Sequence, residues 1–235
     1  MKKVFTALIL SFILVPGALA IEPAHHRVDD LRLAAALAAQ TSQGMDAYLS
    51  TPDAYGTPLI IKLARQGDVK TLQSLTQYPA DGKFLLVTDN YGNNLFHVAK
   101  NADTVQAVAS LIRRYYGAKA ARKIEQLADA RNQLDETPLH TQINAAHTDT
   151  FRPIYTYTSL KKKNDAARTQ LARLHGMDER IFAQHKAIYC QDIMSAGSAN
   201  GITLLQAAQA QIPYNPQMAQ VAATLSRVLP CLAQN

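Results

Sequence analysis

Apolar residues along this chain fall into short stretches with helical spacing, and a polar turn precedes each stretch. Thr57-Pro58 opens one of them, in which apolar positions cover 59–64, and Gly67-Asp68 interrupts it before a second stretch over 69–75. Threonine and aspartate are favoured at helix starts, and a proline in the first turn loses no hydrogen bond. A glycine after the last apolar position is typical of a helix end. Residues 57–75 are therefore predicted to form two short helices joined by a glycine turn.

The same turn and helix start recur three more times, with apolar stretches over 95–99, 139–146 and 204–208. A turn-then-helix unit that recurs along a chain is typical of stacked-repeat folds. Thr137 and Thr203 lie about two such units apart, so a degenerate unit is expected between them.

Two features modify the helices expected in that interval. Pro153 falls inside the second helix of the third unit, so this helix is expected to be bent or to begin late. Tyrosine and threonine alternate over 155–158 and favour extended structure. The chain is predicted to be helical again over 165–187, with a break at Gly176.

These patterns predict an all-α fold, a helical repeat solenoid with a helical cap at each end. The N-terminal cap is expected as a helix over 28–40, which is rich in alanine and leucine, and Gly44 ends it or introduces a turn. Asn215-Pro216 opens the C-terminal capping helix. The expected divisions are a signal peptide at 1–20, the N-terminal cap within 21–52, the repeats with their insertions at 53–211, and the C-terminal cap at 212–235.

The first twenty residues have the three parts of a secretory signal peptide. Met1-Lys2-Lys3 is a basic head, the run from Val4 to Val15 is apolar, and Ala18-Leu19-Ala20 is a small-residue cleavage site. The apolar run is short for a membrane span, and no second apolar stretch is long enough to be one. We expect a mature chain from Ile21, exported to a bacterial periplasm or secreted, with no transmembrane segment.

The charge and the cysteine content indicate which compartment and which kind of partner suit this chain. The formal net charge of +6 includes two lysines of the signal peptide, which leaves about +4 in the mature chain. This mildly basic balance fits an acidic partner or a membrane surface, and it is too weak for a nucleic-acid-binding protein. Cys190 and Cys231 form an even pair, which in an oxidising compartment favours a disulfide over the alternative of two buried free thiols.

The four turns with their helix starts resemble the ankyrin repeat, whose units carry an aspartate-rich turn, a glycine, a Thr-Pro-Leu-His type of helix start and a second helix. In the segment that ends in Thr137-Pro138-Leu139-His140, Asp135 stands in place of the turn glycine. The resemblance extends over 53–211. It implies an ankyrin-like solenoid that binds other proteins through its turn tips and the concave face of its first helices, without catalysis. The matching segments are 53–59, 89–99, 132–140 and 198–203.

Two tyrosines are the main candidates for a partner-binding site. Tyr55 and Tyr91 each come two residues after an aspartate of a turn, so both are expected to project from adjacent tips. Exposed tyrosines suit a protein interface. The alternative is that both rings pack onto neighbouring turns. Four amide side chains are expected to supply hydrogen bonds around them, namely Asn90, Asn93, Asn132 and Gln133.

Other residues offer little chemistry. His97 and His140 occupy the histidine position of the repeat, where the resemblance implies a structural hydrogen bond between neighbouring turns. His140 and His147 could share a helix face, but a third ligand is missing, so no metal site is predicted. The sequence has no nucleophile with a supporting base and no phosphate-binding loop, so we expect no cofactor and no enzyme.

The function predicted from the sequence is that of a protein-protein interaction adaptor. Two alternatives stay open. The first is an accessory factor for a periplasmic enzyme, for instance one that acts in oxidative stress. The second is a secreted effector that acts on a host protein.

Overall fold

A computed structural model describes residues 42–174, 179–229 and 231 of the chain. These residues are mostly helical, which confirms the all-α prediction, and one short antiparallel hairpin joins β1 (Ser198–Ala199) to β2 (Ile202–Thr203). The predicted signal peptide, the mature start at Ile21, the helix expected over 28–40 and the break at Gly176 lie outside the described residues.

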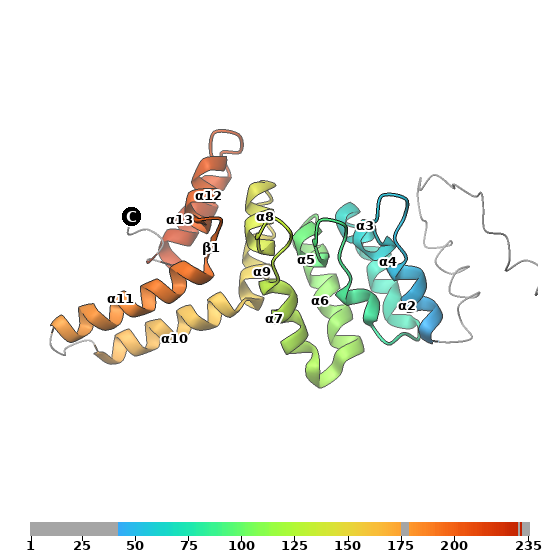
Figure 1. The fold of residues 1–235 in the computed structure, drawn as a ribbon, viewed down its shortest axis with the longest axis horizontal. Helices are drawn as coiled ribbons and strands as arrows, with labels where there is room; N and C mark the ends of the chain where they lie inside the picture. The colour runs from blue at the N-terminus through green and yellow to red at the C-terminus, as the bar shows by residue number, and fades with distance from the viewer. Residues whose placement is uncertain (1–41, 175–178, 230, 232–235) are drawn as a thin grey trace, which may run out of the picture.

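The helices stand in pairs, side by side along the long axis of the molecule (Figure 1). The first helix of each pair packs on the first helix of the next pair. This arrangement buries one face of every short helix against a neighbour, which no single pair could do alone. In chain order the pairs are α3 (Leu59–Gln66) with α4 (Val69–Ser74), α5 (Leu95–Val98) with α6 (Ala102–Tyr116), α8 (Pro138–Asn144) with α9 (Phe151–Tyr157), and α12 (Leu204–Gln211) with α13 (Met218–Val228).

Several helices begin or end at the residues that the sequence marks, whereas α13 begins at Met218, after the predicted start at Asn215-Pro216. Gly67 ends α3 with a φ of 73°, and the Asp68 carboxylate accepts a hydrogen bond from the backbone of the first turn of α4. Asn94 caps α5, and Thr203 caps α12 in a reciprocal arrangement with the glutamine three residues later. Thr137 does not cap α8 with its side chain, because its hydroxyl lies 2.8 Å from Nδ1 of His140 instead.

A helix that the sequence did not predict covers the first pair. This helix, α2 (Ser42–Ser50), buries Met45 and Leu49 against the stack. Gly44 lies inside α2, so the expectation that it ends a helix was wrong, because burial of the neighbouring apolar residues outweighs the low helix propensity of glycine. The linking elements are η2 (Leu75–Gln77), η3 (Lys83–Leu86), η4 (Gly117–Lys119) and α7 (Ala120–Asp129).

The helix α9 differs from the expected extended segment. It begins at Phe151 and runs to Tyr157, so Pro153 lies in its first turn, where the missing N–H has no intrahelical partner to lose. Phe151, Ile154 and Tyr155 fall at helical spacing and are buried. Their burial overrides the strand preference of the tyrosines and threonines.

A long helical hairpin occupies the place of the expected degenerate unit. Its helices, α10 (Ser159–Leu174) and α11 (Glu179–Ala196), extend away from the paired helices (Figure 1). At its base, the Asn164 amide donates a 2.7 Å hydrogen bond to the Val228 carbonyl at the end of α13. Cys190 and Cys231 form a disulfide there with their Cα atoms 5.0 Å apart, as predicted.

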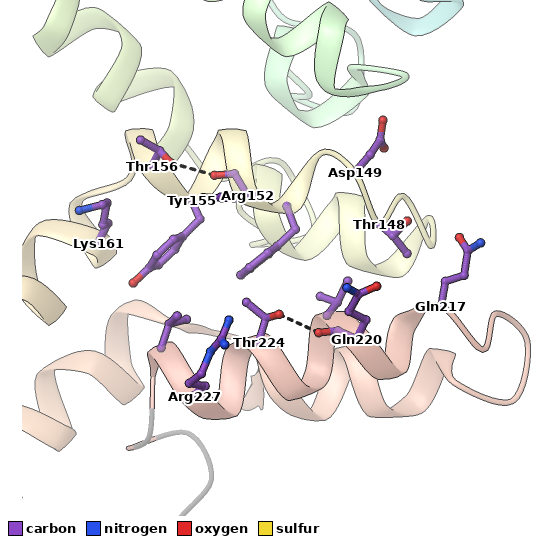
Figure 2. Close-up of a pocket in the computed structure, with 13 residues that line it drawn as sticks. Thr148, Asp149, Arg152, Tyr155, Thr156, Lys161, Gln217, Gln220, Thr224 and Arg227 are labelled. Carbon is purple, nitrogen blue, oxygen red and sulfur yellow. Dashed lines mark hydrogen bonds between the residues drawn. The ribbon is translucent and has the colours of Figure 1, made fainter.

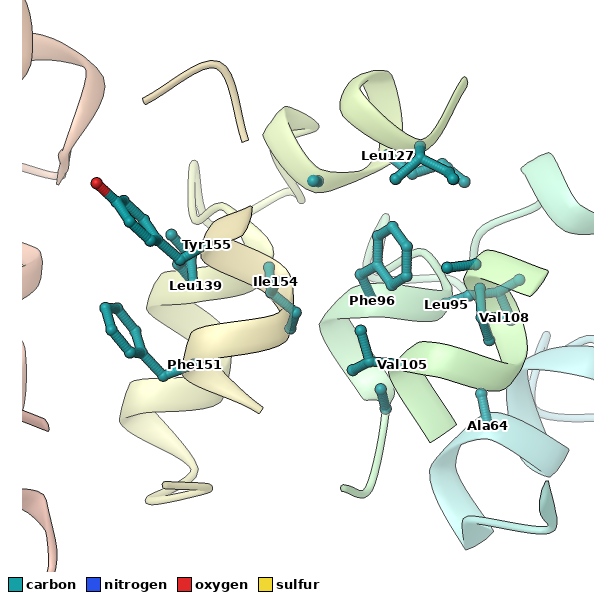
Figure 3. Close-up of a cluster of buried hydrophobic side chains, with 14 of the residues drawn as sticks. Ala64, Leu95, Phe96, Val105, Val108, Leu127, Leu139, Phe151, Ile154 and Tyr155 are labelled. Carbon is teal, nitrogen blue, oxygen red and sulfur yellow. The ribbon is translucent and has the colours of Figure 1, made fainter. Parts of the chain in front are cut away.

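The core is one apolar cluster that runs from pair to pair (Figure 3). Phe84 and Phe96 are its largest fully buried side chains. No helix among the described residues is long and apolar enough to cross a membrane.

Candidate functional site

Three turns at the helix starts share one hydrogen-bonding pattern. In each turn, Oδ1 of the first residue accepts hydrogen bonds from the backbone N–H groups of the third and fifth residues. These bonds measure 2.9 and 2.9 Å for Asp53, 3.0 and 2.9 Å for Asp89, and 2.9 and 3.0 Å for Asn132. Aspartate and asparagine favour turns because their short side chains reach the backbone in this way.

The fourth residue of each turn has a positive φ, which is 73° for Gly56, 76° for Gly92 and 58° for Asp135. At Gly56 a side chain would also collide with Asn90, whose amide atoms lie 2.0 Å from the position of a Cβ. Asp135 adopts the left-handed conformation without glycine, and Arg131 binds its carboxylate at 3.0 Å and its carbonyl at 2.6 Å.

The turns are linked to one another in a row. The backbone carbonyl of the third residue accepts a hydrogen bond from the next turn in each case. Asn90 Nδ2 donates to the Tyr55 carbonyl at 2.8 Å, and the Gln133 backbone N–H donates to the Tyr91 carbonyl at 2.9 Å. The hairpin of β1 and β2 continues the row, because Asn200 Nδ2 donates to the Leu134 carbonyl at 2.7 Å. We call these segments, 53–57, 89–93, 132–136 and 198–203, the turn row.

Apolar side chains stand in solvent along the turn row. The exposed fraction is 82% for Tyr55, 68% for Tyr91, 64% for Leu134 and 51% for Ile202. Both tyrosines therefore project from adjacent turns, as expected, and their rings are not covered by neighbouring turns. Leu134 and Ile202 were not predicted. Aligning Asn132 with Asp89 would have identified Leu134, because both tyrosines and Leu134 are third residues of their turns.

The four amide side chains divide into two groups. Asn90 and Gln133 are exposed beside the tyrosines. Asn132 is buried, and its Nδ2 donates to Oδ1 of Asn93 at 2.9 Å, while Nδ2 of Asn93 lies 3.3 Å from the Asp89 carboxylate. The amides of Asn93 and Asn132 therefore hold neighbouring turns together, and the exposed Asn90 amide does the same through the Tyr55 carbonyl. This role differs from the predicted contact with a partner.

Two buried histidines lie beneath the turn row. Nδ1 of His97 accepts from the Asn94 backbone at 3.2 Å, and Nε2 donates to the Glu136 carbonyl of the next turn at 3.0 Å. Nε2 of the equivalent His140 has no hydrogen-bond partner among the described residues. Burial lowers the pKa of each histidine to about 4.

The third histidine of interest is separated from this pair. His147 lies beyond the end of α8 at Asn144, so it does not share a helix face with His140, and its Nδ1 lies 2.8 Å from Oε1 of Gln142. Within the described residues, no group of three or more histidine, cysteine, aspartate or glutamate side chains is placed to hold a metal ion.

Comparison with models of known protein families finds no match for this chain, and comparison with curated proteins finds no similar sequence. A rigid row of turns presents two tyrosines, a leucine and an isoleucine to solvent, with polar amides between them, and this combination resembles the centre of a protein interface.

Proposed function

We propose that this chain is an exported ankyrin-type repeat protein that binds another protein through its turn row. The repeat assignment is supported by three turns in which one side-chain oxygen accepts hydrogen bonds from two backbone N–H groups of the turn. It is also supported by the helix pairs that follow these turns, and by the hydrogen bond from His97 to the next turn. The export assignment rests on the N-terminal sequence, and the Cys190–Cys231 disulfide is compatible with an oxidising compartment.

The observation that carries the proposal is the exposure of Tyr55 and Tyr91 on turns that are fixed by hydrogen bonds. Tyrosine is enriched among the residues that contribute most to protein binding. Because the backbone of these turns is already ordered, binding would cost little additional conformational entropy. Leu134 extends the same exposed row and adds apolar area next to Tyr91.

The first prediction tests this interface. Affinity purification of the mature chain, followed by mass spectrometry, is expected to return one stoichiometric partner. The double variant Tyr55→Ala with Tyr91→Ala should bind that partner at least about thirtyfold more weakly, because each ring is a candidate hot spot worth about 2 kcal/mol and such contributions are not additive. Calorimetric titration measures the affinity, and thermal unfolding checks that the fold is intact.

Tyr214→Ala is the matched control, since Tyr214 is 85% exposed and lies outside the turn row. It should leave the affinity unchanged. Equal affinity of the double variant and this control would refute the proposed interface. A large fall in melting temperature of the double variant would mean that the rings are packing residues. Turnover of a substrate by the mature chain alone would favour an enzyme instead.

A further inference from the structure

A groove of about 860 Å³ separates the second helices of the last two pairs, α9 and α13 (Figure 2). The first helices of the same pairs, α8 and α12, pack directly on each other. The two pairs are therefore in contact along one side and open along the other, next to the base of the α10–α11 hairpin. This volume lies in the range of sites that bind small molecules and cofactors.

Two aromatic rings with little exposed area form part of the groove floor, Phe151 being 4% exposed and Tyr155 9%. The rings of Phe151 and Tyr155 stack with their centroids 5.7 Å apart and their planes inclined by 12°. Val221 of α13 also lines the groove. The Tyr155 side chain lines the groove (Figure 2), and its hydroxyl accepts a buried 3.3 Å hydrogen bond from Nδ2 of Asn164. Such a floor favours apolar groups of a bound molecule.

The walls carry more positive than negative charge. Arg152 and Arg227 line the groove, and neither forms a salt bridge within the described residues. Lys161 also lines it and is paired with Asp165. Asp149 lies at the far end, where its carboxylate accepts a 2.9 Å hydrogen bond from the backbone N–H of residue 102. A concave surface lined by one sign of charge attracts the opposite sign.

Neutral polar side chains also line the walls, namely three threonines and two glutamines. Gln217 and Gln220 line the groove, and their side-chain amides make no hydrogen bond to the rest of the described chain. An amide offers both donors and acceptors, which match the N–H and C=O groups of an extended peptide. Unpaired arginines bind carboxylates through two parallel hydrogen bonds.

We propose that this groove binds an extended acidic peptide segment of a partner protein. Its carboxylates pair with Arg152 and Arg227, its backbone bonds to the glutamine amides, and its alternate apolar side chains lie on the Phe151 and Tyr155 rings. The groove shares no residue with the turn row, so this site is independent of the interface proposed above.

The experiment selects ligands from a random peptide library displayed on phage, with the disulfide-bonded mature chain as the target. The enriched peptides are then synthesised with one added tryptophan. Because the chain has no tryptophan, the indole fluorescence reports on the peptide alone. The enriched sequences should be acidic, and their binding should weaken as salt is added.

The decisive comparison uses two double variants with the same change in charge. Arg152→Glu with Arg227→Glu should weaken binding at least about tenfold for each arginine, because each loses a charge-assisted hydrogen bond. Arg122→Glu with Arg173→Glu changes exposed arginines outside the groove and should retain most of the affinity. Thermal unfolding should be similar for both variants.

Four results would overturn the proposal. The first is that no peptide, or only neutral or basic peptides, are enriched. The second is equal binding by the two double variants. The third is stoichiometric displacement of the peptide by sodium laurate at a comparable or lower concentration, which would indicate a site for anionic amphiphiles. If instead Tyr55→Ala with Tyr91→Ala abolishes peptide binding, the peptide occupies the turn row, and this proposal fails while the proposed function stands.

Discussion

His97 and His140 take the same place in successive helical pairs, yet their surroundings differ. His97 is bonded at both ring nitrogens, and the proton on Nε2 bridges to the next turn. His140 is bonded at Nδ1 only, and Nε2 is buried without a partner among the described residues. At pH 7 both rings are neutral in the folded protein, because burial lowers the pKa of each to about 4 by disfavouring the imidazolium form.

The pH dependence of stability follows from these two residues. The pKa of each histidine is about 4 in the folded chain and 6.5 when it is unperturbed. Above the unperturbed pKa both states are neutral and the histidines leave stability unchanged. As the pH falls below the unperturbed pKa, the histidines of the unfolded chain take up protons before those of the folded chain do. The free energy of unfolding therefore decreases until the pH reaches the folded pKa, and the total loss is about 3 kcal/mol for each histidine.

Urea unfolding between pH 7 and pH 5 measures this effect. The double variant His97→Gln with His140→Gln is expected to be less stable at pH 7 but to show a flatter pH profile. His185→Gln changes an exposed histidine and should keep the slope of the native chain. A native profile that stays flat down to pH 5 would contradict the prediction.

At the scale of elements, one buried glutamine connects two helical pairs. Gln142 of α8 is almost fully buried, and its Nε2 lies 2.8 Å from the carbonyl of His97, 3.1 Å from that of Phe96 and 3.0 Å from that of Ala99. These carbonyls lie at the end of α5. Because α5 is only four residues long, they have no hydrogen-bond partners within the helix. Oε1 of Gln142 lies 3.1 Å from the Thr150 hydroxyl that precedes α9.

Gln142→Leu is therefore expected to lower the free energy of unfolding by about 3 kcal/mol, because it leaves several buried polar groups without partners. Chemical denaturation measures the loss. Gln126→Leu on the exposed face of α7 is the control and should change stability by less than about 0.5 kcal/mol. If the two variants are equally stable, the role assigned to the Gln142 amide is wrong.

The sequence predicts the elements whose signals are local. Gly67 and Thr203 mark a helix end and a helix start through backbone rules that hold without tertiary contacts. Gln142 has no such signal. From the sequence alone, a glutamine on a helix is expected to face solvent, and only its contacts with distant residues show that it is buried. The segment 155–158 was misassigned because its burial against other helices decides its structure.

At the scale of the whole molecule, the direction of the α10–α11 hairpin could not be predicted from the sequence, because it too depends on tertiary contacts. The sequence indicates helices there, but where they point depends on contacts at the base with α9 and α13. The candidate site was only partly predictable. Tyr55 and Tyr91 follow from the turn pattern, whereas the division of the amides depends on hydrogen bonds between turns far apart in sequence.

The disulfide joins this hairpin to the end of the stack. Cys190 and Cys231 are 41 positions apart in sequence, and the segment they close includes the hairpin of β1 and β2 and the last helical pair. In the chain-entropy model, closing a loop of this length restricts the unfolded chain and stabilises the fold by about 4 kcal/mol. The double variant Cys190→Ala with Cys231→Ala should lose about that much in urea unfolding.

Reduction provides an independent check on the same prediction. Dithiothreitol should destabilise the native chain to a similar degree and leave the double variant unchanged. Since each helical pair packs mainly on its neighbours, hydrogen exchange should become faster in α12 and α13 well before it does in α3 and α4. Uniformly faster exchange in all pairs would mean that the chain unfolds as one cooperative unit, and that the disulfide stabilises every pair equally.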